Sequence, residues 1–407
     1  MRILFVTNQI GTGGAEIFML RLAWMLSRQH EVFLYEVYPT RKDLSTFIAH
    51  HVAKDFTPTF LHTLQLGAAT DNLLWRVNGL LNRFGIRNTR VRMRQFLEGR
   101  FLRKQISKHG IQVVNAHLWE ADLFVAKQLR SMPFVISMHG SFEKYNRLVD
   151  QQGNIVVDNV VYDRKHFDLA THTIFKKTSA VVLASERNRL LPDRHGFSGP
   201  ITKIYYGYTP PDRTEAAVEK HTFIIGLFAR GIEAKGWQVL IDAFEMLLKK
   251  GYDHIELQLG YTDHPYIASL KEKYVSEPRI RFLGFLADVE PVLRTWDLVV
   301  FPTYYAAESL PNTVIESLMN GKPVISTDAG DIADMLDIGS GERAGKIIPL
   351  THQPPDPEAF ANAIEEYLCD KGLLSKHRDY ALAAGRKFDM NLCAEKYVQV
   401  FERILHP

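Results

Sequence analysis

The sequence predicts an α/β protein with two Rossmann-like, doubly wound domains, and three observations support this prediction. The chain has 407 residues, a length at which two domains are the natural expectation. Residues 3–35 read as strand, glycine-rich turn, helix and strand, the βαβ unit that opens a doubly wound sheet. Residues 298–326 read as strand, loop, helix and strand, and the apolar run 298–301 is typical of a strand buried on both faces.

The composition is that of an ordinary globular enzyme, with 46% apolar and 23% charged residues. Cys369 and Cys393 have no metal-ligand spacing, so they are expected to be free thiols in a reducing compartment. The first residues lack the apolar region and cleavage site of a signal peptide, and no apolar stretch reaches the roughly eighteen residues of a spanning helix. These features predict a cytoplasmic protein.

The net charge of +3 conceals an asymmetry between the two halves. Residues 1–205 hold 28 Lys and Arg against 16 Asp and Glu, whereas residues 206–407 hold 21 against 30. A basic first half predicts an anionic partner there: a lipid-phosphate acceptor, a membrane surface or a nucleic acid. The sequence contains no nucleic-acid-binding motif, so no nucleic-acid partner is expected.

The first turn of the chain is rich in glycine and precedes a predicted helix over 15–27. Its glycines are Gly11, Gly13 and Gly14. A dinucleotide site is one interpretation, because Glu36 follows the glycines by about 20 residues. Glu16, however, fills the third glycine position of that motif, which argues against the close packing that NAD needs. A plain tight turn is the remaining interpretation of the glycines alone.

Residues 73–104 combine basic side chains with leucine and aromatic residues at helical spacing. The basic residues are Arg76, Arg83, Arg87, Arg90, Arg92, Arg94, Arg100, Arg103 and Lys104, and Glu98 is the only acid among them. Such a combination is typical of an interfacial helix on an anionic bilayer. A solvated helix face packed on the domain is the alternative.

Two histidines follow predicted strands of the first domain. His117 comes shortly after a strand at 112–115, and His139 directly after a strand at 134–138. Ligands bind at the carboxyl ends of strands in open α/β sheets, so both side chains are candidate ligand contacts. An ordinary loop histidine is the alternative for each. The insertion over 141–175 is not assigned a structure by its sequence.

The second domain opens with a predicted strand at 223–229 and a helix at 237–249. Arg230 and Lys235 lie on the loop that joins them. Two cations beside a helix start suit a diphosphate, and exposed loop charges are the alternative. Further strands are predicted at 255–260 and 280–284.

The stretch from 298 to 330 carries two glutamates eight positions apart. Glu308 precedes a predicted helix and Glu316 lies within it. Between them, at Leu310, Asn312 and Thr313, the unpaired amides of a helix start suit a phosphate. A carboxylate on each side can accept hydrogen bonds from hydroxyls, so the unit suits a phosphorylated, hydroxyl-rich ligand such as a sugar nucleotide. Two solvated surface glutamates are the alternative.

At these residues the chain resembles the retaining glycosyltransferases of family four, which have the GT-B fold of two Rossmann-like domains facing a central cleft. The family's Glu-x7-Glu motif matches Glu308 to Glu316, and its Gly-x-Pro-Val strand matches residues 321–324. The chain departs from the family at Ser309, where glycine is usual, and at Gly330-Asp331, where Gly-Gly is frequent. The resemblance covers the C-terminal half well and the N-terminal half through three short motifs.

The resemblance implies roles for the matched residues. In the second domain these are the donor diphosphate for Arg230 and Lys235, the donor sugar for Glu308, the ribose for Glu316 and the base for the backbone at Gly284-Phe285. In the first domain they are a match to the family's glycine loop at Gly13-Gly14 and a donor-sugar contact at His139. The match of His117 is less specific.

The resemblance therefore implies a retaining enzyme that moves a sugar from a nucleoside-diphosphate sugar to a glycan or lipid-linked acceptor, as in bacterial surface polysaccharide synthesis. Front-face attack with the diphosphate as base is the expected mechanism. The sequence has no Asp-x-Asp motif, so no metal and no other cofactor is expected. A sugar-nucleotide 2-epimerase of the same fold and an inactive donor-binding module are the alternatives.

Three segments are expected along the chain. Residues 1–207 form the acceptor-side domain and residues 208–388 the nucleotide-sugar-binding domain, with a polar linker that contains Pro210-Pro211. Residues 389–407 form a helix that crosses back to the first domain, as the resemblance implies. The resulting enzyme would be cytoplasmic, with a peripheral membrane contact through 73–104.

Overall fold

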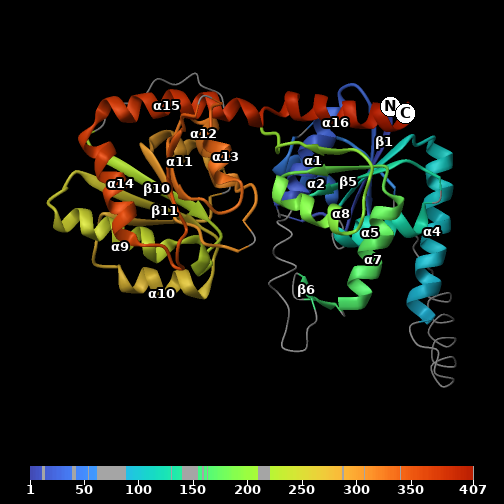
Figure 1. Ribbon diagram of the computed structural model, residues 1–407, viewed down its shortest axis with the longest axis horizontal. Helices are drawn as coiled ribbons and strands as arrows, with labels where there is room; N and C mark the ends of the chain where they lie inside the picture. The colour runs from blue at the N-terminus through green and yellow to red at the C-terminus, as the bar shows by residue number, and fades with distance from the viewer. Residues whose placement is uncertain are drawn as a thin grey trace.

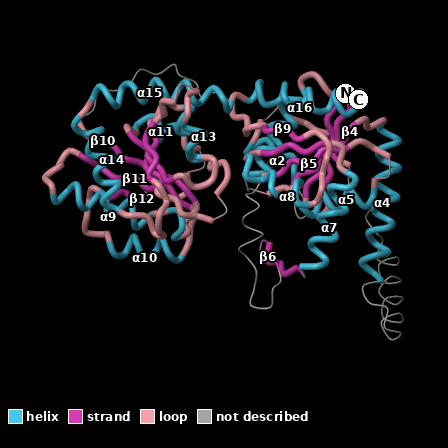
Figure 2. Tube along the Cα trace, viewed as in Figure 1, coloured by secondary structure: helices cyan, strands magenta, loops and turns pink. Residues whose placement is uncertain are grey.

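The computed structural model of the protein describes residues 1–11, 14–38, 43–53, 55–61, 89–129, 131–139, 155–157, 160–162, 164–209, 221–286, 288–306, 308–339 and 341–406. Two lobes are visible in Figure 1, each with a sheet at its centre and helices around it. Figure 2 shows the strands of each lobe gathered between helical layers. The described part thus forms the two doubly wound units that the sequence predicts.

The first lobe contains a parallel sheet in the order β3-β2-β1-β4-β5-β8-β9. Its strands are β1 (Arg2–Thr7), β2 (Glu31–Glu36), β3 (Thr59–Phe60), β4 (Val113–His117), β5 (Phe134–Met138), β8 (Ala180–Leu183) and β9 (Ile201–Lys203). Its described helices are α1 (Gly14–Ser27), α2 (Leu44–His51), α4 (Thr89–His109), α5 (Trp119–Gln128), α7 (Arg164–Lys177) and α8 (Leu190–Arg194). The strand order reverses between β1 and β4, and such switch points form ligand-binding crevices at the carboxyl ends of the strands.

The second lobe contains a parallel sheet in the order β12-β11-β10-β13-β14-β15. Its strands are β10 (Phe223–Ala229), β11 (Ile255–Tyr261), β12 (Ile280–Gly284), β13 (Leu298–Phe301), β14 (Val324–Thr327) and β15 (Gly345–Ile348). Its helices are α9 (Trp237–Lys249), α10 (Pro265–Lys273), α11 (Glu290–Thr295), α12 (Asn312–Met319), α13 (Ile332–Leu336), α14 (Pro357–Cys369) and α15 (Lys371–Gly385). Here the order reverses between β10 and β13, which places a second crevice beside the loops after these strands.

Helix α16 (Met390–Leu405) begins beside the second lobe and ends over the first. Figure 1 shows it packed beside α1, with the two chain termini close together. The Asp389 carboxylate accepts a hydrogen bond from the Asn391 amide at 2.7 Å and so caps the helix, a contact that typically contributes about 1 kcal/mol. The Tyr397 hydroxyl, on the buried face of α16, lies 3.0 Å from the Ser137 hydroxyl of β5.

Direct contacts join the two lobes at the side chain of Asp331. The Ser185 hydroxyl, after β8, donates to its Oδ1 at 2.5 Å, and Lys203 Nζ of β9 lies 3.1 Å from its Oδ2. Asp331 is only 5% exposed, so this charge is shielded from solvent and depends on these partners. We refer to Ser185, Lys203 and Asp331 as the interlobe contact.

The structure adds to the sequence expectations in three places. Strand β4 continues to His117, so this histidine ends a strand instead of following one. The unassigned insertion contains a hairpin of β6 (Ile155–Val157) and β7 (Val160–Tyr162) and most of α7. The sequence does not predict strands β3 and β15 or helices α2, α5, α10, α11, α13 and α15. Residues 140–154 and 210–220, which include most of the linker, lie outside the described residues.

Candidate functional site

A buried ion pair occupies the switch point of the second sheet. Lys235 Nζ, on the loop after β10, lies 2.6 Å from Glu308 Oε2, on the loop after β13. The side chains of Lys235 and Glu308 are each 7% exposed. The Thr303 hydroxyl donates to the same carboxylate oxygen at 2.9 Å. The predicted diphosphate cation and the predicted sugar-binding carboxylate are therefore partners of each other.

The loop geometry that places Lys235 requires a glycine after it. Gly236 has a φ of 83°, and a Cβ at this position would lie 2.2 Å from the Pro302 carbonyl oxygen. Both the left-handed backbone and the close approach to the end of β13 exclude a side chain. The Tyr304 amide donates to the Ala234 carbonyl at 2.9 Å, which joins the two loops beside the ion pair.

Tyr305 links the two predicted diphosphate cations. The guanidinium carbon of Arg230 lies 5.0 Å from the centre of its ring, and Lys235 Nζ lies 4.8 Å from the same centre. Both distances are within the range of a cation–π contact. Arg230 itself is exposed, so it can turn toward a ligand, whereas Lys235 is held in the interior.

Helix α12 starts beside this pair and has no side-chain cap. Its first amides, at Asn312 and Thr313, are therefore not engaged by a capping side chain and can face an anion. The Thr313 hydroxyl donates to the Phe228 carbonyl at 2.7 Å, which fixes the helix start against the end of β10. Leu310, just before the helix, is buried. The glycine loop of the first lobe approaches from the other side, where a Cβ on Gly14 would lie 3.3 Å from Asn312 Nδ2.

The loop that carries Glu308 is braced by the segment after β14. The Asp331 amide donates to the Ser309 carbonyl at 3.0 Å. Gly330 has a φ of 61°, and a Cβ on it would lie 2.7 Å from the same carbonyl oxygen. Of the family's two glycines, this chain keeps the first as Gly330, where the backbone conformation requires a glycine. The second is replaced by Asp331, whose carboxylate makes the interlobe contact.

Glu316 lies one helical turn into α12 and is half-buried. Burial raises the pKa of its carboxyl to about 7; the positive charge of Arg21 opposes this rise and Asp288 adds to it. Arg21 belongs to α1 of the first lobe, and its guanidinium carbon lies 5.0 Å from the ring centre of Tyr208. Glu316 thus faces the boundary between the lobes and is close to changing its charge at neutral pH.

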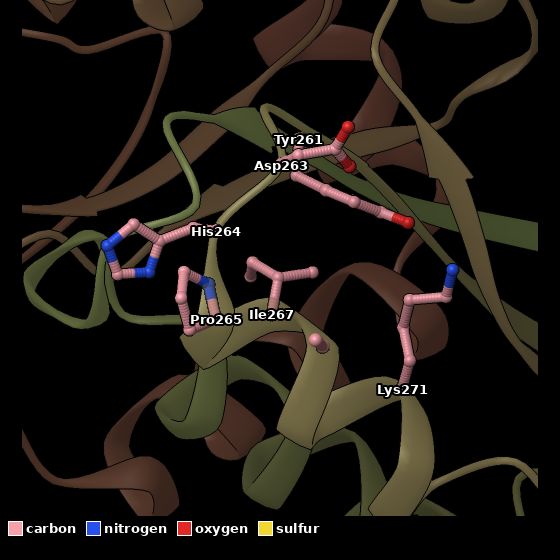
Figure 3. Close-up of a pocket in the computed structure, with 7 residues that line it drawn as sticks. Tyr261, Asp263, His264, Pro265, Ile267 and Lys271 are labelled. Atoms are coloured by element: carbon pink, nitrogen blue, oxygen red, sulfur yellow. The ribbon is translucent and has the colours of Figure 1, made fainter.

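Two further features border the second sheet. The predicted base-binding residues Gly284 and Phe285 stand at the end of β12, and the Phe285 ring is 68% exposed. A surface pocket of about 360 Å³ lies between the loop after β11 and the first turns of α10. Figure 3 shows Tyr261 and Lys271 on one side of this pocket and His264 on the other. The pocket adjoins the Arg230 loop, since the Gly231 amide donates to the Thr262 hydroxyl at 3.1 Å.

The first lobe brings its two histidines together at the carboxyl ends of β4 and β5, beside its switch point. His117 Nδ1 lies 2.7 Å from His139 Nε2, and His139 Nδ1 lies 2.9 Å from the Tyr206 hydroxyl. His117 Nε2 lies 2.7 Å from Asn115 Oδ1. The Asn115 amide donates to the Ser137 hydroxyl at 3.0 Å, and Ser137 contacts Tyr397 of α16. We call this series, from Tyr206 to Tyr397, the histidine chain.

The donor and acceptor roles along the histidine chain follow from the hydrogen bond between Asn115 and the Val135 carbonyl. Asn115 Nδ2 donates to the Val135 carbonyl, which can only accept, so Asn115 Oδ1 must face His117. His117 Nε2 then donates and its Nδ1 accepts from His139 Nε2, which leaves His139 Nδ1 as an acceptor beside the Tyr206 hydroxyl. That hydroxyl also donates to the His139 carbonyl at 3.2 Å. Burial lowers the pKa of His139 to about 3, and burial followed by the neighbouring His139 lowers the pKa of His117 well below its usual range. The chain is thus neutral throughout.

The predicted residues gather in two groups. Arg230, Lys235, Glu308, Leu310, Asn312, Thr313 and Glu316 line one side of the boundary between the lobes, and Gly14 approaches them from the other. His139 lies in the first lobe with both ring nitrogens already bonded, so a sugar that contacts either nitrogen must displace a partner. Gly13 lies outside the described residues.

Sequence reasoning missed several partners of these residues. Thr303 and Tyr305 sit between β13 and Glu308, close enough in sequence for their roles to have been considered. Tyr206, Ser137 and Tyr397 come from three separate elements, and no local pattern connects them. Among the residues that the structure describes, no group of three or more His, Cys, Asp or Glu side chains is arranged to hold a metal ion.

The two doubly wound sheets, each with one switch point, define a two-domain protein of the GT-B class. Residues 219–370 match the family model described as glycosyl transferases group 1, and residues 12–208 match the one described as glycosyltransferase family 4. The chain belongs to this glycosyltransferase family, and it is an enzyme of that class. The predicted family is therefore confirmed.

Two of the curated relatives are named as glycosyltransferases of different substrates. A lipopolysaccharide core biosynthesis mannosyltransferase of Rhizobium meliloti is 26% identical over 249 residues, which cover 57% of this chain and 68% of the relative. A D-inositol 3-phosphate glycosyltransferase of Corynebacterium kroppenstedtii is 31% identical over 173 residues, which cover 40% of this chain and 36% of the relative. The chain thus spans about a third of the length of the second relative.

Solved structures show the same fold over the whole chain. The Anabaena protein HepE, solved in complex with UDP, superposes with a TM-score of 0.70 at 18% identity and covers 99% of this chain and 100% of its own. Sucrose-phosphate synthase of Thermosynechococcus elongatus superposes with a TM-score of 0.67 at 16% identity. The superposition covers 99% of this chain and 98% of the synthase chain. These likenesses confirm the predicted GT-B fold.

Proposed function

We propose that the protein is a retaining glycosyltransferase that uses a nucleoside-diphosphate sugar and acts in bacterial surface polysaccharide synthesis. Its acceptor is a glycan or a lipid-linked saccharide, bound by the first lobe. The observation that carries this proposal is the convergence of Lys235, Glu308 and the uncapped start of α12 at one switch point. The name of the R. meliloti relative and the UDP bound to HepE support the donor class and the biosynthetic setting.

The chemistry follows from where negative charge develops. When the glycosyl–phosphate bond breaks, charge accumulates on the leaving diphosphate. Arg230, Lys235 and the amides of Asn312 and Thr313 are placed to stabilise it by fixed positive charge and dipoles. In that step Lys235 exchanges its contact with Glu308 for the diphosphate, and the Glu308 carboxylate becomes able to accept hydrogen bonds from sugar hydroxyls. Glu316 is assigned to the ribose hydroxyls and the backbone at Gly284-Phe285 to the base.

A donor screen tests this proposal directly. Purified protein is mixed with UDP- and GDP-sugars, and a shift in melting temperature identifies the donor, since a ligand at 100 times its Kd stabilises by about 2.7 kcal/mol. NMR of the product with a supplied acceptor then gives the anomeric configuration. Retained configuration supports the proposal, and inversion contradicts it. Epimerised donor would identify a 2-epimerase, and binding without turnover would identify an inactive donor-binding module.

We further propose that no metal or other cofactor takes part, because protein cations face the leaving group. Transfer should therefore proceed unchanged in EDTA after the protein has been dialysed against it. Activity that disappears in EDTA and returns with Mn²⁺ or Mg²⁺ would contradict this assignment. A Lys235→Ala variant rescued by metal would be a second sign of the same error.

We also propose a cytoplasmic location with a peripheral contact to anionic lipid through residues 73–104. The described part of this stretch forms the first turns of α4, where Phe96 is 58% exposed and Met93 38% exposed. Residues 73–88 lie outside the described residues. Among the helices of the described part, none is both long and apolar enough to cross a membrane.

Vesicle sedimentation tests the lipid contact. Wild-type protein should sediment with anionic vesicles at low salt and dissociate as salt rises, since each basic residue near such a surface contributes about 1 kcal/mol. Replacing Arg83, Arg87, Arg90 and Arg94 by Ser should weaken sedimentation and leave donor binding intact. Equal binding to neutral and anionic vesicles, or none to either, would contradict the contact and favour a soluble acceptor.

A further inference from the structure

A cavity at the carboxyl end of the first sheet lies behind the histidine chain. It is enclosed by the ends of β1, β4 and β5 and by helices α5, α7 and α8. Its free volume is about 70 Å³, which is room for roughly five water-sized groups. The polar side chains on its wall are Asn8, Glu120, Asp122, Ser137, His139 and Thr171, and the rest of the wall is mainly apolar. We refer to this cavity as the Asp122 pocket.

Asp122 is the unusual member of this wall. Its side chain is 6% exposed, and its Oδ1 has no hydrogen-bond partner within the described part of the chain. A buried carboxyl oxygen without a partner is costly, and native proteins rarely retain one without a role. Burial, and then the negative charge of Glu120, raise the pKa of Asp122 well above its usual range. The carboxyl is therefore suited to donate as well as to accept a hydrogen bond.

The neighbours of Asp122 are already engaged elsewhere. Asn8 Oδ1 accepts from the Ala121 amide at 2.7 Å, and Asn8 Nδ2 donates to Glu120. The indole of Trp119 donates to the Thr171 hydroxyl at 3.1 Å and stacks on Phe167 with 4.9 Å between ring centres. The wall is thus braced by its own hydrogen bonds, and Asp122 Oδ1 is a polar atom at the cavity without a hydrogen-bond partner within the described part of the chain.

The backbone beside the pocket is strained. Leu118 has a φ of 76° and is the only residue other than glycine with a positive φ among the residues that the structure describes. Such a conformation costs of order 1–3 kcal/mol in a side chain of this size, and it is retained where the site requires it. Here it turns the chain from β4 into α5 and places Leu118 and Trp119 on the cavity wall.

We propose that the Asp122 pocket binds a hydroxyl-bearing edge of the acceptor sugar, and that this part of the acceptor carries no negative charge. The inference rests on the proposed glycosyl transfer and defines its acceptor more closely. A sugar edge offers hydroxyls for Asp122 and C–H groups for the apolar wall, and its size suits the free volume. Glu120 is negatively charged beside the pocket and no Lys or Arg lines it among the described residues, so a phosphate or carboxylate would meet a like charge and no counterion there. Any anionic group of the acceptor must lie outside, on the basic surface of the lobe.

Saturation-transfer NMR with methyl glycosides tests this inference without requiring turnover. The probes are methyl α-mannoside, methyl β-glucoside and methyl β-galactoside, with methyl β-glucuronide as the anionic probe, each titrated with and without UDP. At least one neutral glycoside should bind, and the glucuronide should bind about tenfold more weakly or not at all. Asp122→Ala should weaken the neutral glycoside about tenfold, whereas Asp122→Asn, which keeps a hydrogen-bonding group, should remain within about threefold.

The control variant is Asp193→Asn, which changes an exposed carboxylate on α8 outside the pocket wall and should bind as the wild type does. UDP titration of every variant reports on the donor site and confirms folding. Failure of all neutral glycosides, equal binding by Asp122→Ala, or preference for the glucuronide would overturn the inference while leaving the proposed function intact if UDP binds. Glycoside binding without binding of any nucleotide would instead contradict the proposed transfer.

Discussion

The carboxyl ends of the two sheets carry side-chain pairs of different electrostatic character. In the second lobe the loops after β10 and β13 meet in a charged pair, Lys235 and Glu308, with 2.6 Å between them. In the first lobe the ends of β4 and β5 meet in a neutral pair, His117 and His139, with 2.7 Å between ring nitrogens. The same topology therefore positions fixed charge on one side of the boundary and uncharged hydrogen-bonding groups on the other. That difference fits a dianionic donor facing a hydroxylated acceptor.

Of the changes considered, removal of the Lys235 ammonium should lower stability and activity most. Lys235→Ala leaves Glu308 buried without its counterion, which should cost about 3–5 kcal/mol of stability. It should also lower kcat/KM at least about tenfold, which corresponds to about 1.4 kcal/mol of transition-state stabilisation. Denaturant unfolding and steady-state kinetics measure the two effects.

A double variant separates stability from catalysis at the same pair. Lys235→Met with Glu308→Gln removes both charges, so it should regain most of the stability but none of the activity. Lys249→Ala, which changes an exposed cation on α9, is the matched control. Kinetics of Lys235→Ala equal to those of the wild type would rule out its role at the diphosphate.

The neutral histidine pair, His117 and His139, should make the free energy of unfolding fall as the pH is lowered. His117 and His139 have pKa values below that of an unfolded histidine, so the unfolded chain binds more protons as pH falls below about 6.5. Their contribution to stability is complete above that pH and is lost toward about pH 3, by about 1.4 kcal/mol per histidine for each pH unit. Urea unfolding between pH 7 and pH 5 measures this slope.

The control for the acid response keeps the hydrogen bonds but removes the protonation. A His117→Gln, His139→Gln variant should lose less stability between pH 7 and pH 5 than the wild type. Parallel curves for the two proteins would mean that the histidines are not neutral in the folded state.

The interlobe contact joins the two sides, and weakening it should have an intermediate effect. Lys203→Ala leaves the 5% exposed carboxylate of Asp331 with Ser185 as its remaining side-chain partner, at a cost of about 1–3 kcal/mol. We expect a larger radius of gyration in solution scattering and a higher donor KM. Arg187→Ala, which removes an exposed side chain near the Asp328 carbonyl, should change both by much less. Identical scattering of Lys203→Ala and wild type would argue against a role in holding the lobes together.

Glu316 should give an effect with the opposite pH dependence. Its folded pKa is raised to about 7, so the stabilisation is complete below about pH 4.5 and is lost as pH rises through 7. Relative to Glu316→Gln, the wild type should lose up to about 1.4 kcal/mol per pH unit across this window. Thermal melts at matched pH values measure the difference. A constant difference from pH 5 to pH 8 would place the carboxyl pKa at its ordinary value.

Much of the second lobe was predictable because its signals are local. The helix over 237–249 and the strands at 280–284 and 298–301 have the predicted bounds, since each is set by an apolar run and a nearby glycine or proline. Glu308, Arg230 and Lys235 were found through their positions relative to those elements. The ion pair itself was not predicted, because its partners are 73 residues apart and only the sheet topology brings them together.

The candidate site of the first lobe was less predictable because its contacts join residues that are far apart in the sequence. The histidine chain joins side chains from β4, β5, the segment after β9 and α16, and their sequence separations reach 260 residues. No periodicity or residue spacing in the sequence indicates that these side chains contact one another. Asp122 also gave no signal, because an acid in the first turn of a helix is ordinarily a favourable and solvated residue. Its burial becomes visible only when α7 and α8 cover the helix start.

The short segment from Gly330 to Asp331 has a thermodynamic consequence. Its backbone supports the Ser309 carbonyl beside Glu308, and its carboxylate is shared with Ser185 and Lys203 of the other lobe. If a bound sugar nucleotide shifts this loop, the free energy of closing the lobes must change by the same amount that closing changes donor affinity. Loosening Lys203 would then weaken the nucleotide from a distance, and a saturating nucleotide would restore lobe closure in return. Through Gly330 and Asp331, donor binding and closure of the two lobes would then be thermodynamically linked.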